Sequence, residues 1–162
     1  QSTGTGPFGC DVLRRVHCGF RSIWVADVSV ASLKPVARTL VVVCRAWGPA
    51  VLLMALIFVS SSLPNPPDAP GGLSDVGAHA IVYGVLGVLI LRGLANARWR
   101  DVTFALGWGA VVLSGLYGAS DEFHQSFVEN RVADVNDLIA DILGAFVGIA
   151  LVWGWGIVLS LR

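Results

Sequence analysis

Four long apolar segments dominate the sequence, and each is long enough to cross a bilayer as a helix. They extend from about Ala37 to Leu63, Asp75 to Leu94, Val102 to Gln125 and Val135 to Leu161. The hydrocarbon core of a bilayer is about 30 Å thick, so about 20 helical residues span it. Charged residues make up 14% of the chain, whereas soluble domains carry roughly 25%. We therefore expect an all-α membrane protein, folded as a compact bundle of four transmembrane helices.

The positions of Lys and Arg predict how this bundle is oriented. Of the 11 basic residues, all but Arg131 lie in or near the N-terminal region, between the second and third apolar segments, or at the C-terminus. Cytoplasmic flanks of membrane helices are enriched in Lys and Arg. We therefore expect a multi-pass protein of the cell membrane with both termini in the cytoplasm. The Pro-rich loop at 64–72 and the segment at 126–134 are then expected to face outward.

Residues 1–35 differ from the rest of the chain. They mix Gly, Ser and Arg without sustained periodicity, and they lack the arrangement of a secretory signal peptide. We expect a poorly ordered cytoplasmic tail at 1–35, followed by a single four-helix transmembrane domain at 36–162. Cys10, Cys18 and Cys44 have neither disulfide-like nor zinc-finger spacing, so we expect reduced thiols.

Polar residues recur at helical spacing in three of the four segments. The three stripes are Asp75, His79 and Tyr83; Ser114, Gly118, Asp121 and Gln125 with Glu122 beside them; and Asp134, Asp137, Asp141 and Gly144. Residues three or four apart share one face of a helix. A charged group at the centre of a spanning helix costs about 2.5–3.5 kcal/mol on insertion scales, so such groups need partners or a wet cavity.

The depths of these stripes agree. His79 lies about five residues from the outer end of its segment, or roughly 7–8 Å, and Asp141 about six residues, or roughly 9 Å. About 20 residues carry the third segment some 30 Å, to the neighbourhood of Asp121. We therefore expect one polar pocket at the level of the outer leaflet, with Arg131 on the loop above it.

Four sequence elements resemble the VanZ-like family. They are Ser60-Ser61-x-Leu63-Pro64, Asp75-x-x-x-His79-x-x-x-Tyr83, Asp121-Glu122-Phe123-His124-Gln125-x-Phe127, and Arg131-x-x-Asp134-x-x-Asp137-x-x-x-Asp141-x-x-Gly144-x-x-x-Gly148. The resemblance covers about residues 46–155. Many members have Lys where this chain has Val76, and Pro-Gly where it has Glu129-Asn130. The family is named for an accessory protein that gives low-level teicoplanin resistance, so the resemblance implies a membrane protein of the glycopeptide-resistance type.

Ionisable residues inside a membrane are functional-site candidates by default. A network that only fixes helix packing is the alternative, although interhelical hydrogen bonds in membranes average only about 0.6 kcal/mol. The predicted acid–base residues are Glu122, His79 and His124. The predicted binding residues are Asp75, Tyr83, Asp121, Gln125, Arg131, Asp137 and Asp141. Arg131 is expected to meet an anionic group because guanidinium matches phosphate or carboxylate, with an ion pair to Asp134 or Asp137 as the alternative.

No cofactor is expected from the spacing of metal-ligand types. Two imidazoles with several carboxylates could hold zinc, with Glu122 as general base, but no His-x-x-x-His or Glu-x-x-His pair shares one helix face. The expected partners are membrane lipids and a lipid-linked envelope precursor or lipoglycopeptide, with no nucleic acid. The pocket is expected to act on or bind such an amphiphile and so affect teicoplanin susceptibility. A non-catalytic structural or binding protein is the alternative, and catalysis stays open at this point.

Overall fold

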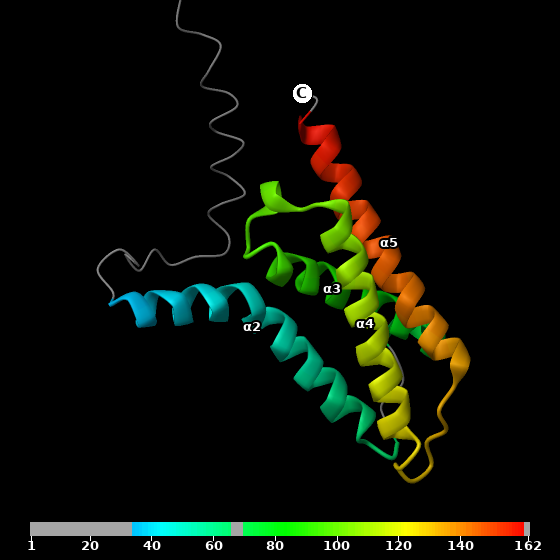
Figure 1. Ribbon diagram of the computed structural model, residues 1–162. Helices are drawn as coiled ribbons and strands as arrows, with labels where there is room; N and C mark the ends of the chain where they lie inside the picture. Colours follow the sequence, from blue (N-terminus) through cyan, green and yellow to red (C-terminus); the bar gives the residue numbers. More distant parts are fainter. Residues whose placement is uncertain (1–33, 66–69, 161–162) are drawn as a thin grey trace, which may run out of the picture. The chain divides into compact units, whose positions relative to one another are not determined.

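The computed structural model describes residues 34–65 and 70–160. In those ranges the chain forms only helices: α2 Pro35–Ser61, α3 Asp75–Leu94, α4 Phe104–Gln125 and α5 Val135–Ser160, with short 3-10 helices η2 Pro70–Gly72 and η3 Trp99–Asp101 (Figure 1). The all-α prediction is confirmed for this part of the chain. The tail expected at 1–35 lies almost wholly outside the described residues. The chain divides into two units, 1–38 and 39–162, and the arrangement below concerns the second.

Three of these helices, α2, α3 and α5, are long and apolar enough to cross a membrane. Helix α4 has 22 residues but falls short of the same apolarity, because Gly, Ser and an acidic pair interrupt it. Large apolar side chains lie exposed on all four helices, for example Val59, Val85, Leu116 and Leu151. Exposed apolar surface of this extent is typical of a membrane or protein interface. The chain is therefore a multi-pass membrane protein.

Side-chain caps explain where the helices begin. The Ser74 hydroxyl accepts a hydrogen bond from the backbone N–H of Gly77 at 3.2 Å, so Ser74 is the N-cap of α3. The Thr103 hydroxyl accepts from the Leu106 N–H at 3.3 Å and makes α4 begin at Phe104, two residues later than expected. Each cap satisfies a backbone donor that the first helical turn would otherwise leave unpaired.

Helices α3 and α5 form the tightest contact in the bundle. A Cβ atom on Gly144 would overlap the carbonyl oxygen of Ala80, and one on Gly148 would overlap the carbonyl oxygen of Gly84. Small residues four apart let helix backbones approach closely in membranes. The contact holds the first turns of α3 against those of α5, and it thereby positions His79 opposite Asp141.

Helix α2 bends part-way along its length (Figure 1), and Pro49 lies inside it. Proline has no N–H, so the carbonyl of Arg45, four residues earlier, loses its helical partner. Arg92 of α3 supplies the missing donor: its Nη1 donates to the Arg45 carbonyl at 2.6 Å and to the Ala46 carbonyl at 3.0 Å. A charged donor thus ties the bend of α2 to the last turn of α3.

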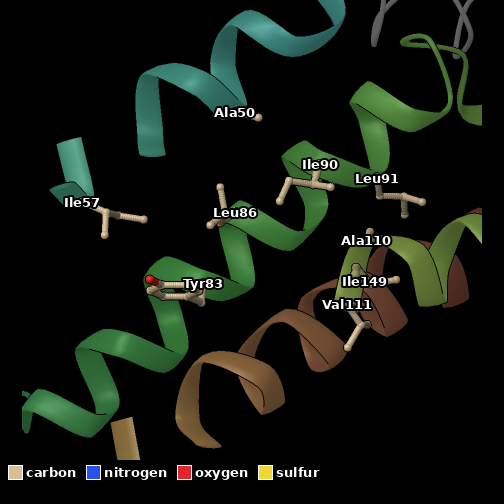
Figure 2. Packing of buried hydrophobic residues seen from close by; sticks show 9 residues of the cluster. All are labelled: Ala50, Ile57, Tyr83, Leu86, Ile90, Leu91, Ala110, Val111 and Ile149. Carbon is tan, nitrogen blue, oxygen red and sulfur yellow. The ribbon is translucent and has the colours of Figure 1, made fainter. Parts of the chain in front are cut away.

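Close backbone approaches join α3, α4 and α5 to one another, whereas α2 meets this core mainly through side chains. Ala50 and Ile57 of α2 belong to the apolar cluster that includes Tyr83, Leu86 and Ile90 of α3 (Figure 2). The Tyr117 hydroxyl of α4 also donates to the Met54 carbonyl of α2 at 2.6 Å. This looser contact leaves space between α2 and the other helices.

Candidate functional site

Helices α2 and α4 end, and α5 begins, at the same end of the bundle (Figure 1). Ser62 Oγ lies 3.0 Å from His124 Nε2, so the end of α2 lies beside the end of α4. Glu122 Oε2 accepts a hydrogen bond from the Asp134 N–H at 2.8 Å, which ties α4 to the residue before α5. These contacts place the ends of α2 and α4 and the beginning of α5 at one level of the bundle.

A polar contact between two side chains joins α3 to α5 in this region. His79 Nδ1 lies 3.0 Å from Asp141 Oδ1, and the Asp141 side chain is 0% exposed. Gly118 of α4 makes room for this carboxylate, because a Cβ atom there would lie 2.6 Å from Asp141 Oδ2. The carboxylate of Asp141 therefore sits between all three helices of the core.

Glu122 completes a cluster of three ligand-type side chains. One donor atom each from His79, Glu122 and Asp141 lie within 4.8 Å of one another. Glu122 Oε1 and Asp141 Oδ2 are buried and have no hydrogen-bond partner among residues 34–65 and 70–160. A buried acceptor left unpaired costs about 1–3 kcal/mol, and more when it is charged. These two oxygens are therefore able to bind a proton, a water molecule or a metal ion.

A cavity of about 260 Å³ opens next to this cluster, between α2 and the core. Its apolar wall consists of Leu53, Leu56, Ile57, Ala78 and Val82, and its polar wall of Ser60, Ser61, His79, Tyr83, Asp121, Gln125 and Arg131. Gln125 Nε2 donates to Asp121 Oδ2 at 3.1 Å, while Asp121 Oδ1 and the Tyr83 hydroxyl have no partner. His79 belongs to both the cavity wall and the cluster behind it.

Arg131 is the cationic side chain that lines this cavity. Its Nε atom is buried without a hydrogen-bond partner. The ion pairs in the described part of the chain are His79–Asp141 and Arg98–Asp101, so Arg131 forms no ion pair with Asp134 or Asp137 there. The alternative considered for Arg131 from the sequence is thus not what the structure shows. Its guanidinium is available to a ligand.

Three predicted site residues lie apart from both the cavity wall and the cluster of His79, Glu122 and Asp141. His124 hydrogen-bonds Ser62 and stacks on Phe58 with ring centroids 4.5 Å apart. Asp75, the first residue of α3, is exposed, and Asp137 is partly buried. Neither of them lines the cavity. The serines at the end of α2 were not among the predicted site residues, although their run of three hydroxyls next to an apolar segment was a visible signal.

Comparison with known proteins identifies one family. A family model described as VanZ/LLP1 matches residues 74–159, slightly more than half of the 162 residues. The match begins at the N-cap of α3, ends within the last turn of α5 and contains all three polar stripes. No curated protein and no solved structure matches the chain.

Proposed function

The chain belongs to the VanZ/LLP1 family, and from this premise we propose that its cavity binds the anionic headgroup of an amphiphilic cell-envelope molecule. The observation that carries the proposal is the unpaired Arg131 guanidinium on a cavity wall. A planar guanidinium binds phosphate and carboxylate through two parallel hydrogen bonds. Through this binding the protein lowers susceptibility to the lipoglycopeptide teicoplanin.

The two walls of the cavity suit an amphiphile. Arg131 and the other polar residues would meet the headgroup, while Leu53, Leu56 and Ile57 of α2 would meet an acyl or polyprenyl chain. A volume of about 260 Å³ is below the roughly 300–1,000 Å³ typical of pockets that enclose a drug-sized ligand. We therefore propose that the cavity takes a headgroup and the first part of a chain, with the remainder in the membrane. The partner is a lipid-linked envelope precursor or the lipoglycopeptide itself.

Placing this cavity at the outer leaflet requires four spans with both termini in the cytoplasm. Two features support this orientation. The ends of α2 and α4 lie side by side, because Ser62 contacts His124. This is expected if α4 crosses the same thickness of membrane as α2. Arg92, Arg98 and Arg100 lie at the opposite end, where cytoplasmic basic residues are expected. We therefore propose that α4 spans the cell membrane despite its polar residues.

Cysteine labelling tests this topology. Glu129 and Asp101 are both exposed acids, one on each proposed side of the membrane. In a chain whose native cysteines are replaced by Ser, we expect Glu129→Cys to react with a membrane-impermeant maleimide in intact cells. Asp101→Cys should react only after permeabilisation. Labelling of both from outside would show that α4 does not span, and the reverse pattern would show the opposite orientation.

The chemistry of the cluster allows both binding and acid–base catalysis. In the catalytic form of the proposal, Glu122 and His79 transfer protons to and from the bound headgroup. His124 would act at the rim, since its Nε2 is shared with Ser62. In the binding form, the same groups only hold the headgroup. Both forms need Arg131.

Replacing Arg131 with Ala tests the function. We expect teicoplanin susceptibility of a Gram-positive host to return fully to that of cells without the protein, while membrane abundance stays within about twofold. Arg98→Ala is the matched control, because the Arg98 side chain is 73% exposed and pairs only with Asp101 at 3.9 Å. Such exposed pairs contribute about 0–1 kcal/mol. Wild-type protection by Arg131→Ala at normal abundance would refute the proposal.

A second candidate function is supported by the His79–Asp141 hydrogen bond, which joins α3 and α5. In that case the polar cluster only fixes helix packing. Substitutions in the cavity would then reduce protection in proportion to lost protein, whereas the binding proposal expects lost protection with protein retained.

A further inference from the structure

The buried ionisable groups at this end of the bundle are mostly acidic. Asp121, Glu122 and Asp141 are 4%, 7% and 0% exposed. The basic groups at the same level are His79 and Arg131 on the cavity wall and His124, which is hydrogen-bonded to Ser62. An ion removed from water costs several kcal/mol unless an opposite charge or hydrogen bonds compensate it. The carboxylates therefore need additional positive charge, which a metal ion or bound protons could supply.

The distances between His79, Glu122 and Asp141 are close to those of a metal site. Their donor atoms lie within 4.8 Å of one another, and His79 Nδ1 and Asp141 Oδ1 are 3.0 Å apart. Bonds of about 2.0–2.2 Å to zinc place two tetrahedral ligands roughly 3.3 Å apart. Glu122 has the most rotatable bonds of the three side chains, so small rotations can bring its free oxygen towards the other two ligands.

The hydrogen bonding of the two carboxylates is a second, independent observation. Each is more than nine-tenths buried, with one oxygen in a polar contact and the other without a partner. Glu122 Oε2 accepts a hydrogen bond from the Asp134 N–H, a group outside the three proposed ligands. Groups that orient ligating carboxylates in this way are typical of metal sites. Glu122 Oε1 and Asp141 Oδ2 are left free to bind.

We infer that His79, Glu122 and Asp141 bind one divalent transition-metal ion, and that this ion is Zn²⁺. One imidazole and two carboxylates are donors that zinc accepts. Three protein ligands leave a coordination position for water, as in catalytic zinc sites. Because His79 also lines the cavity, the ion would lie at the cavity wall. The inference is independent of the anionic ligand and would stand if Arg131 had no role.

The sequence analysis named no metal because no two ligands share a helix face at the usual spacing. That argument applies to ligands within one helix. The three side chains identified here come from α3, α4 and α5, so their proximity depends on the packing of the bundle. The two-imidazole site considered from the sequence is not formed in the described residues, since His124 is not part of the group.

Metal binding to the full chain in detergent tests the inference. Because Cys10, His17, Cys18 and Cys44 are further metal-ligand types, all four are first replaced by Ser or Ala. The protein is first stripped of metal with a chelator and then dialysed against Zn²⁺. We expect mass spectrometry to find one equivalent of zinc per chain. His79→Ala, Asp141→Asn and Glu122→Gln should each weaken binding at least tenfold. Asp101→Asn, which removes an exposed carboxylate, should bind Zn²⁺ as tightly as the parent does.

Two further measurements keep the result decisive. Circular dichroism and thermal unfolding establish which variants fold. If His79→Ala and Asp141→Asn do not fold, the zinc affinity of Glu122→Gln, which keeps the side-chain shape, tests the inference. Arg131→Ala should retain the ion, so loss of protection without loss of metal separates this inference from the proposed function. Absence of stoichiometric Zn²⁺ in the parent, or unchanged binding in folded Glu122→Gln, would overturn it.

Discussion

Replacing Gly144 with Val is expected to leave almost no folded protein in the membrane. A Cβ atom at this position would overlap the carbonyl oxygen of Ala80, and nearby backbone atoms of α3 leave no room for it to move aside. Overlap with a helix backbone can be relieved only by separating the two helices. Separation would remove the α3–α5 contact and the His79–Asp141 hydrogen bond with it.

Gly154 on the same helix provides the control. A Cβ atom there has nothing within 4 Å, so Gly154→Val should accumulate as the wild type does. Membrane abundance and the elution profile of the detergent-solubilised protein measure the difference. We expect at least a tenfold loss of monodisperse protein for Gly144→Val only. Equal yields for the two variants would show that α3 and α5 do not pack at Gly144.

The second large effect is expected at the His79–Asp141 pair. Asp141 is fully buried, and within the described part of the chain His79 provides the one hydrogen bond of its carboxylate. Removing one partner of a buried ion pair costs about 3–5 kcal/mol, whereas replacing both partners with apolar groups is often nearly neutral. We therefore expect His79→Leu to destabilise the bundle strongly. The double variant His79→Leu/Asp141→Ala should recover most of that loss.

Thermal unfolding in detergent, with the Asp141→Ala single variant completing the cycle, measures this coupling. The pair is in contact, so the three free-energy changes should not add. A double variant as unstable as the sum of the two single variants would show that the pair is not a coupled unit. Recovery of stability in the double variant separates the folding role of the pair from its role in function.

Much of the helix arrangement could be predicted from the sequence because its causes are local. Ser74 caps α3 through its own hydroxyl, and the apolar lengths determine four helices within about two residues at each end. The common level of His79, Asp121 and Asp141 also followed from the constant rise of a helix. The close approach at Gly144 and Gly148 followed from their spacing.

Other features depend on how each helix is rotated about its axis, which the sequence pattern did not determine. Helix α2 has no ionisable residue at its C-terminal end, and its run of serines alone did not determine that Ser60 and Ser61 line the cavity. His124 lies one residue before the end of α4, where helical spacing no longer predicts direction. The role of Gly118 in making room for Asp141 depends on the position of α5 against α4.

The most direct test of a functional polar cluster is the teicoplanin susceptibility of cells that carry the His79→Leu/Asp141→Ala double variant at wild-type membrane abundance. If the cluster and its cavity act on an envelope molecule, these cells should be as susceptible as cells without the protein, although the bundle is folded. Protection equal to that of the wild type would contradict this and would leave the cluster with a role in helix packing alone.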